Sequence, residues 1–141
     1  MPAAIGVPYV TRVTPRLEVM LSEGLYALAR LAPGSDLPTW AQGEFVAMVR
    51  SRHGLTIACR QDLVPPGVES EAGFRCFEIV GPFELTSLGV VAAASGALAA
   101  RGVSLFLFST WETDFFLVKA AALDLAIDAL ITAGHTVRDG S

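Results

Sequence analysis

The chain has 141 residues, of which 52% are hydrophobic and 17% charged, and its formal net charge is −4. A chain of this size can form one compact domain, or two very small units that share a core. Lys and Arg are scattered singly, which gives nucleic acid no basic face, and no apolar run approaches the ~20 residues of a membrane helix. We therefore expect a soluble, cytoplasmic protein that binds neither nucleic acid nor membranes.

Residues 1–16 are predicted to form a poorly ordered leader. Pro2, Pro8 and Pro15 oppose regular structure. Arg12 is the only charged side chain among the first fifteen residues, and no long apolar run follows it, so the pattern of a secretory signal is missing. At the other end, residues 139–141 are expected to be a short tail.

Residues 17–73 are predicted to be the weaker of two structural units. Four apolar runs read as strands, at Leu17–Leu21, Gly24–Leu31, Phe45–Arg50 and Leu55–Cys59. Between them, the segment from Pro33 to Gly43 has room for only a turn or so of helix around Pro38–Ala41, with Trp40 filling the core beneath it. Gln61–Val64 is a second helical stub. We expect Leu17–Leu21 to complete the sheet of this degenerate first unit.

Residues 74–138 give a clearer pattern. Phe74–Val80 alternates at its start and ends at Gly81-Pro82, which indicates a strand followed by a breaker. Apolar residues three and four apart from Thr86 to Arg101 predict a helix, which Thr86 or Ser87 can cap. A hairpin follows, with strands at Val103–Thr110 and Phe115–Lys119. A second helix is expected from about Ala121 to Gly134, and a last strand at His135–Arg138.

The order strand, helix, strand, strand, helix, strand is the ferredoxin-like βαββαβ arrangement. With about eight strands over the whole chain, the sequence predicts an α+β protein of two such units, the first degenerate, with antiparallel sheets and helices on one face.

The stretch from Phe77 to Lys119 resembles the second unit of the small tandem-ACT proteins related to the CASTOR arginine sensor, within the ACT domain family. The similarity rests on the Gly81-Pro82 break before Thr86, on Thr113-Asp114 and on Leu117–Lys119, and it extends over about Leu17–Val137. It implies a regulatory protein without catalytic activity, in which an amino acid lies at a junction of ACT units. A homodimer would restore the larger number of units in the eukaryotic sensor.

The loop before the first helix of the second unit is the first candidate site. Backbone N–H groups at a helix start are unsatisfied and attract a carboxylate. Thr86 and Ser87 can add hydroxyl donors, or they can simply cap the helix. Gly89, in the expected first turn, suits the close approach of a ligand or of another backbone. The candidates from this loop are Thr86, Ser87, Leu88, Gly89 and Val90.

The turn at residues 110–114 is the second candidate site. Asp114 follows a polar turn, precedes two aromatic residues and can bind an ammonium or guanidinium group by a charge-assisted hydrogen bond. The alternative is an ordinary turn residue exposed to solvent. Thr113 matches the Thr-Asp pair of the family, and Thr110 can offer a hydroxyl from the strand end. Trp111 can shield a ligand or fill a subunit interface.

Catalytic, cofactor and metal sites are not expected. No nucleophile stands beside a His and a carboxylate, no phosphate-loop motif is present, and His53 and His135 lack the spacing of metal ligands. Cys59 and Cys76 lie in apolar runs and are expected to be buried, reduced thiols. The competing function is a ligand-free dimerisation or protein-interaction module.

Overall fold

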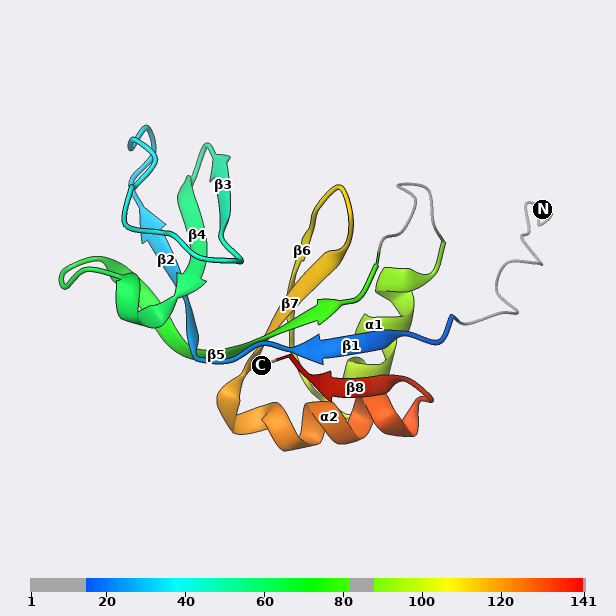
Figure 1. Ribbon diagram of the computed structural model, residues 1–141. Helices are drawn as coiled ribbons and strands as arrows, with labels where there is room; N and C mark the ends of the chain where they lie inside the picture. Colours follow the sequence, from blue (N-terminus) through cyan, green and yellow to red (C-terminus); the bar gives the residue numbers. More distant parts are fainter. Residues whose placement is uncertain (1–14, 82–87, 141) are drawn as a thin grey trace.

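The computed structural model describes residues 15–81 and 88–140, and within them the chain forms eight strands, two α-helices and two 3-10 turns (Figure 1). The elements are β1 (Glu18–Leu21), β2 (Tyr26–Leu31), β3 (Ala47–Ser51), β4 (Gly54–Arg60), a 3-10 turn (Gln61–Leu63), β5 (Glu69–Ile79), α1 (Val90–Ala99), β6 (Phe106–Ser109), β7 (Asp114–Lys119), a 3-10 turn (Ala120–Ala122), α2 (Leu123–Thr132) and β8 (Thr136–Asp139).

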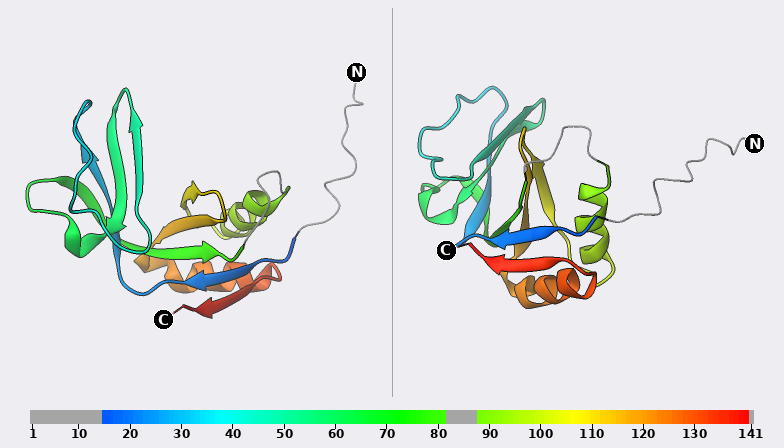
Figure 2. Two further views of the ribbon diagram at one scale, coloured as in Figure 1. Left: turned by 45° about the horizontal axis from the view of Figure 1, so that its top comes forward. Right: turned by 45° about the vertical axis from the view of Figure 1, so that its right-hand side comes forward.

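The long strand β5 joins the two parts of one eight-stranded sheet. Its first half pairs with β2, which gives the first unit the strand order β3-β4-β2-β5. Its second half pairs with β7 on one side and β1 on the other, which gives the second unit the order β6-β7-β5-β1-β8. In Figure 2 the first unit rises as a separate arm from the plane that contains β1, β5 and β8. One strand therefore carries the backbone from one unit into the other.

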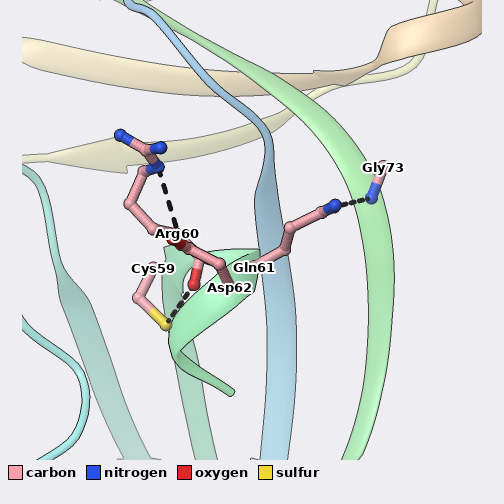
Figure 3. A network of polar contacts seen from close by, with 5 residues as sticks. All are labelled: Cys59, Arg60, Gln61, Asp62 and Gly73. Carbon is pink, nitrogen blue, oxygen red and sulfur yellow. Dashed lines mark hydrogen bonds and ion pairs between the residues drawn. The ribbon is translucent and has the colours of Figure 1, made fainter.

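β5 bends at Gly73, between its two halves. The pairing register with β2 shifts at this point, and Gly73 has a φ of +86°, which strains any other residue. Its N–H donates to the Gln61 side chain at 2.9 Å, from the 3-10 turn that replaces a helix in the first unit (Figure 3). The bulge is thus held in place by the turn that follows β4.

The second unit has the predicted α+β architecture. α1 and α2 pack against one face of its sheet, where Phe77 stacks on Phe116 with ring centroids 4.9 Å apart. The buried alanines of both helices allow this close packing, as at Ala94 and Ala126, each with 0% exposure. The βαββαβ order from β5 to β8 is confirmed.

The first unit keeps the strands of the same order but loses its helices. The segment from Pro33 to Gly43 forms turns and bends, so the helical turn expected at Pro38–Ala41 is wrong. Two prolines and two glycines in so short a segment explain this, because none of them favours a helix. The core lies around Leu55 and Ile57, and Trp40 packs against it as predicted.

Leu17–Leu21 does not complete the first unit as expected. β1 instead lies in the second unit, antiparallel to β5 and parallel to β8. Val19, with 0% exposure, contributes to the core beneath α1 and α2. The first unit obtains its fourth strand from the beginning of β5, which starts at Glu69, before the expected Phe74.

His135 fastens the start of β8 to the start of β1. The ring is buried, and its Nδ1 accepts a hydrogen bond from the Leu17 N–H at 3.1 Å. Burial lowers the pKa of His135 below its ordinary value of 6.5, while a backbone hydrogen bond with Ala93 opposes that shift. Folding therefore favours the neutral imidazole.

We expect the free energy of unfolding to decrease as the pH falls below about 6.5. In the unfolded state His135 takes up a proton near its ordinary pKa, whereas in the folded state it resists protonation. The stability that neutral His135 contributes is therefore complete above about pH 6.5 and lost as the pH falls below it. Urea unfolding between neutral and mildly acidic pH measures the effect. His135→Asn, whose amide oxygen can accept from Leu17, should flatten the pH dependence in this window, whereas exposed His53→Gln should leave it unchanged. A wild-type stability that stays constant through this window would contradict the assignment.

Candidate functional site

Asp114 lies at the end of the second-unit sheet. It is the first residue of β7, and it pairs with Ile79 at the end of β5 and with Ser109 at the end of β6. Alternate residues of a strand share a face, so Asp114 lies on the same face as Phe116, which packs beneath the helices. The carboxylate is partly exposed at the rim of the helix-covered face.

Thr110 and Thr113 hold the turn that precedes Asp114. The Thr110 N–H and hydroxyl both donate to the Thr113 carbonyl, at 2.8 and 2.9 Å, and the Thr110 hydroxyl accepts from the Thr113 N–H at 3.1 Å. The Thr113 hydroxyl donates to the Ile79 carbonyl at the end of β5. These contacts fix the turn against β5, and with it the position of Asp114.

The helix predicted from Thr86 begins at Val90 instead. Gly89 is the residue before its first turn, with a φ of +81°, and its carbonyl accepts from the Ala93 N–H at 2.9 Å. A left-handed residue at this position cannot continue a helix toward Thr86, which explains the difference. Thr86 and Ser87 lie outside the described residues. Leu88 is 74% exposed.

Val90, the first residue of α1, is buried in the core of the second unit. Its side chain is buried in the same cluster as Ile79, the strand partner of Asp114. Only the backbone of Val90 can therefore face a ligand. Around Gly89 there is little space on one side, because a Cβ there would lie 3.3 Å from the Pro15 side chain. Asp114, beside Ile79, and the start of α1 therefore both border the core cluster beneath the helices.

A cleft of about 700 Å3 lies on a different side of the hairpin, between residues 44–49 and the end of β6. Thr110 and Thr113 line this cleft, whereas Asp114 and the described residues of the loop before α1 do not. The eight predicted site residues therefore do not form one continuous lining in the part of the chain that the structure describes. Two of them face the junction between the units.

Sequence reasoning missed the residues that form the rest of this cleft, among them Glu44, Phe45 and Glu78. A signal for Glu78 was available, because it is a charged residue inside the apolar strand β5, next to fully buried Phe77. Glu44 and Phe45 gave no such signal, since only the folding of the first unit brings them against the hairpin.

Both cysteines are buried free thiols, as predicted. Burial raises the pKa of Cys59 and raises that of Cys76 to about 12, which keeps both protonated at neutral pH. Over residues 15–81 and 88–140, no group of three or more His, Cys, Asp and Glu side chains is arranged to hold a metal ion. Neither of the described α-helices has the length and apolarity that crossing a membrane requires.

Comparison with family models gives two matches along the chain. Residues 69–132 match the model described as ACT domain, and residues 24–67 match a second model that describes an N-terminal domain. The boundary between the matches falls just before β5, the strand that pairs with strands of both units. No curated protein matches the chain significantly.

Solved structures resemble the chain over most of its length. Protein Atu0741 from Agobacterium tumefaciens is 32% identical, with a TM-score of 0.85, over 91% of this chain and 96% of that one. VC0802 from Vibrio cholerae, a protein of unknown function described as a possible transport protein, is 24% identical, with a TM-score of 0.68 over 83% and 89%. The ligand-free regulatory subunit of aspartate kinase from Thermus thermophilus is 13% identical, with a TM-score of 0.59 over 82% and 97%. The similarity to VC0802 and to the aspartate kinase subunit is a similarity of fold.

Proposed function

The chain belongs to the ACT domain family, and we propose that it is a regulatory protein that binds a free amino acid. The observation that carries this proposal is the pairing of Asp114 with Ile79, which lies in one cluster with Val90 at the start of α1. An anionic side chain and a helix N-terminus that border the same core cluster are complementary to the two charged groups of an amino acid.

In the proposed complex, the ligand's α-carboxylate accepts from the backbone N–H groups in the first turn of α1, with Leu88 and Gly89 beside it. Thr86 and Ser87, outside the described residues, are proposed as further donors. The ammonium group binds Asp114, which the hydrogen-bonded turn of Thr110 and Thr113 holds in position. The resemblance to a regulatory subunit of aspartate kinase supports the functional class.

We also propose that the chain divides into a degenerate first ACT unit at residues 17–73 and a full second unit at 74–138, as in the tandem-ACT proteins related to CASTOR. The bend at Gly73 and the family-model boundary support this division. β1 is then a strand of the first segment that is built into the second sheet.

A thermal-shift screen against the twenty standard amino acids tests the proposal. A ligand bound only by the native state stabilises it by about 2.7 kcal/mol at a hundred times its dissociation constant. For a chain of this size that free energy raises the melting temperature by roughly 5–10 °C. We expect one amino acid, or a few of similar side chain, to give such a shift. No shift with any of them would contradict amino-acid binding.

A ligand-free dimerisation module is the second candidate, because of the outer face of α1. The helix contains no charged residue, and Val91, Ala92, Gly96 and Ala99 are exposed on it. A helix that is apolar all round is normally covered. Sedimentation at increasing concentration distinguishes the candidates: a homodimer without any amino-acid shift would favour this function, and a shift with a monomer would favour ligand binding alone.

A further inference from the structure

The cleft between the two units is bordered by two strands that are each paired on one side only. β3 pairs with β4, and β6 pairs with β7; in the ladders formed by the described residues neither has a second neighbour. Both strands contribute to the lining, β3 through Ala47–Val49 and β6 through Leu107–Ser109. The free backbone groups of a sheet edge can pair with an added strand.

The β6 edge lacks the charge, proline or bulge that often keeps other strands away. Its sequence, Phe106–Ser109, contains no charged residue and no proline, and its four residues pair with β7 without a register shift. Proteins usually protect such an edge with a lysine, a proline or a bulge. Phe106 is 46% exposed on this strand. The edge is therefore suited to receive a partner.

Phe45 holds the two edges on opposite sides of the same cleft. It precedes β3 and stacks on Phe115 of β7, with ring centroids 4.4 Å apart, and it contacts Phe108 of β6 at 5.8 Å. Along this part of the sheet the strand order is β3-β4-β2-β5-β7-β6. The contacts of Phe45 therefore bring the two outermost strands, β3 and β6, toward each other. The aromatic rings form an apolar wall of the cleft between them.

The cleft carries negative charge. Its lining contains Glu44, Glu78 and Glu112 but no Lys or Arg, and none of the ion pairs found among the described residues includes these three. Glu78 pairs across the sheet with Phe115, and Phe115 with Phe108 of β6. The side chains of Glu78, Phe115 and Phe108 therefore form a cross-strand row that ends at the unpaired edge of β6.

We propose that this cleft binds an extended segment of a partner protein, with basic side chains at alternate positions, as an added strand on the β6 edge. The main chain pairs with β6, which a segment without proline at the pairing positions can do whatever its side chains. The carboxylates select Lys or Arg on the side that faces the cleft. This site is separate from the amino-acid site proposed at Asp114, because Asp114 does not line the cleft.

Fluorescence anisotropy with labelled peptides tests the proposal on the full chain. The probe is a short peptide in which lysine alternates with valine; the comparison peptides replace lysine by glutamate, or carry N-methyl groups on alternate backbone amides. We expect saturable binding of the lysine peptide, at least about tenfold weaker binding of the N-methylated one, because it loses several hydrogen bonds, and no detectable binding of the glutamate peptide.

Protein variants provide the matched control. Glu44→Gln with Glu112→Gln should weaken binding of the lysine peptide roughly three- to tenfold, the effect of removing two exposed ion pairs, whereas Glu23→Gln with Asp124→Asn, outside the cleft, should not. Equal binding of the N-methylated peptide would overturn strand addition. Competition by free lysine amide as strong as by the peptide would overturn it in favour of a small cation. A dimer that forms through β6 and that the peptide does not displace would show a second copy in the cleft instead.

Discussion

Asp114→Asn should weaken amino-acid binding by about ten- to a hundredfold, the loss expected when a hydrogen bond to a charged group is replaced by a neutral one. Asparagine keeps the size of the side chain, and its amide can still occupy the end of β7 beside Ile79. It lacks the charge that the ligand's ammonium group needs. Calorimetric titration with the amino acid identified by thermal shift measures the change.

Glu112→Gln is the matched control for this variant, because it removes one carboxylate from the same connection two residues earlier. Glu112 lines the cleft between the units and lies away from the sheet position of Asp114. The control should bind the amino acid as the wild type does. If Asp114→Asn binds unchanged, the ammonium site has been assigned to the wrong residue; if both variants lose binding equally, the ligand occupies the cleft.

Phe45→Ala should lower the free energy of unfolding by about 3–5 kcal/mol, the usual cost of deleting a buried phenylalanine ring. Phe45 is 6% exposed, and its ring contacts Tyr26 of the first unit together with Phe108 and Phe115 of the second. Chemical denaturation of the variant and of the wild type gives the difference.

Trp111→Ala serves as the comparison for Phe45→Ala, since it also removes a large aromatic side chain. Trp111 is 73% exposed at the turn of the hairpin, so its removal should change stability by less than about 0.5 kcal/mol. Because β5 pairs with strands of both units in one continuous sheet, we expect unfolding of the wild type in a single transition. Two separate transitions, with Phe45→Ala affecting neither strongly, would show that the units do not share a core.

The sequence predicted the elements of the second unit well because each is an apolar segment with clear polar or glycine boundaries. The β6–β7 hairpin consists of two short apolar runs joined by a polar turn, and α2 is a periodic apolar segment that ends before Gly134. The start of α1 was misjudged because Thr86 is a good capping residue by type, whereas the backbone turn at Gly89 is visible only in its dihedral angle.

Strand neighbours could not be predicted with the same success, because sheet order depends on long-range contacts. β1 lies between β5 and β8, which are far from it in sequence. Residues Glu69–Gly73 contain no large apolar side chain, yet they extend β5 because β2 offers an edge to pair with. The cleft was missed for the same reason, since Phe45 meets Phe115 only after both units have folded.

The most direct test of amino-acid binding at the end of the second-unit sheet is an amide NMR titration with the ligand found by thermal shift. The account predicts that the largest shifts occur at Leu88–Val91 and at Thr113–Asp114, and that Asp114→Asn removes them at the same ligand concentration. Largest shifts at Phe45, Phe108 and Glu112, or none at the start of α1, would contradict it.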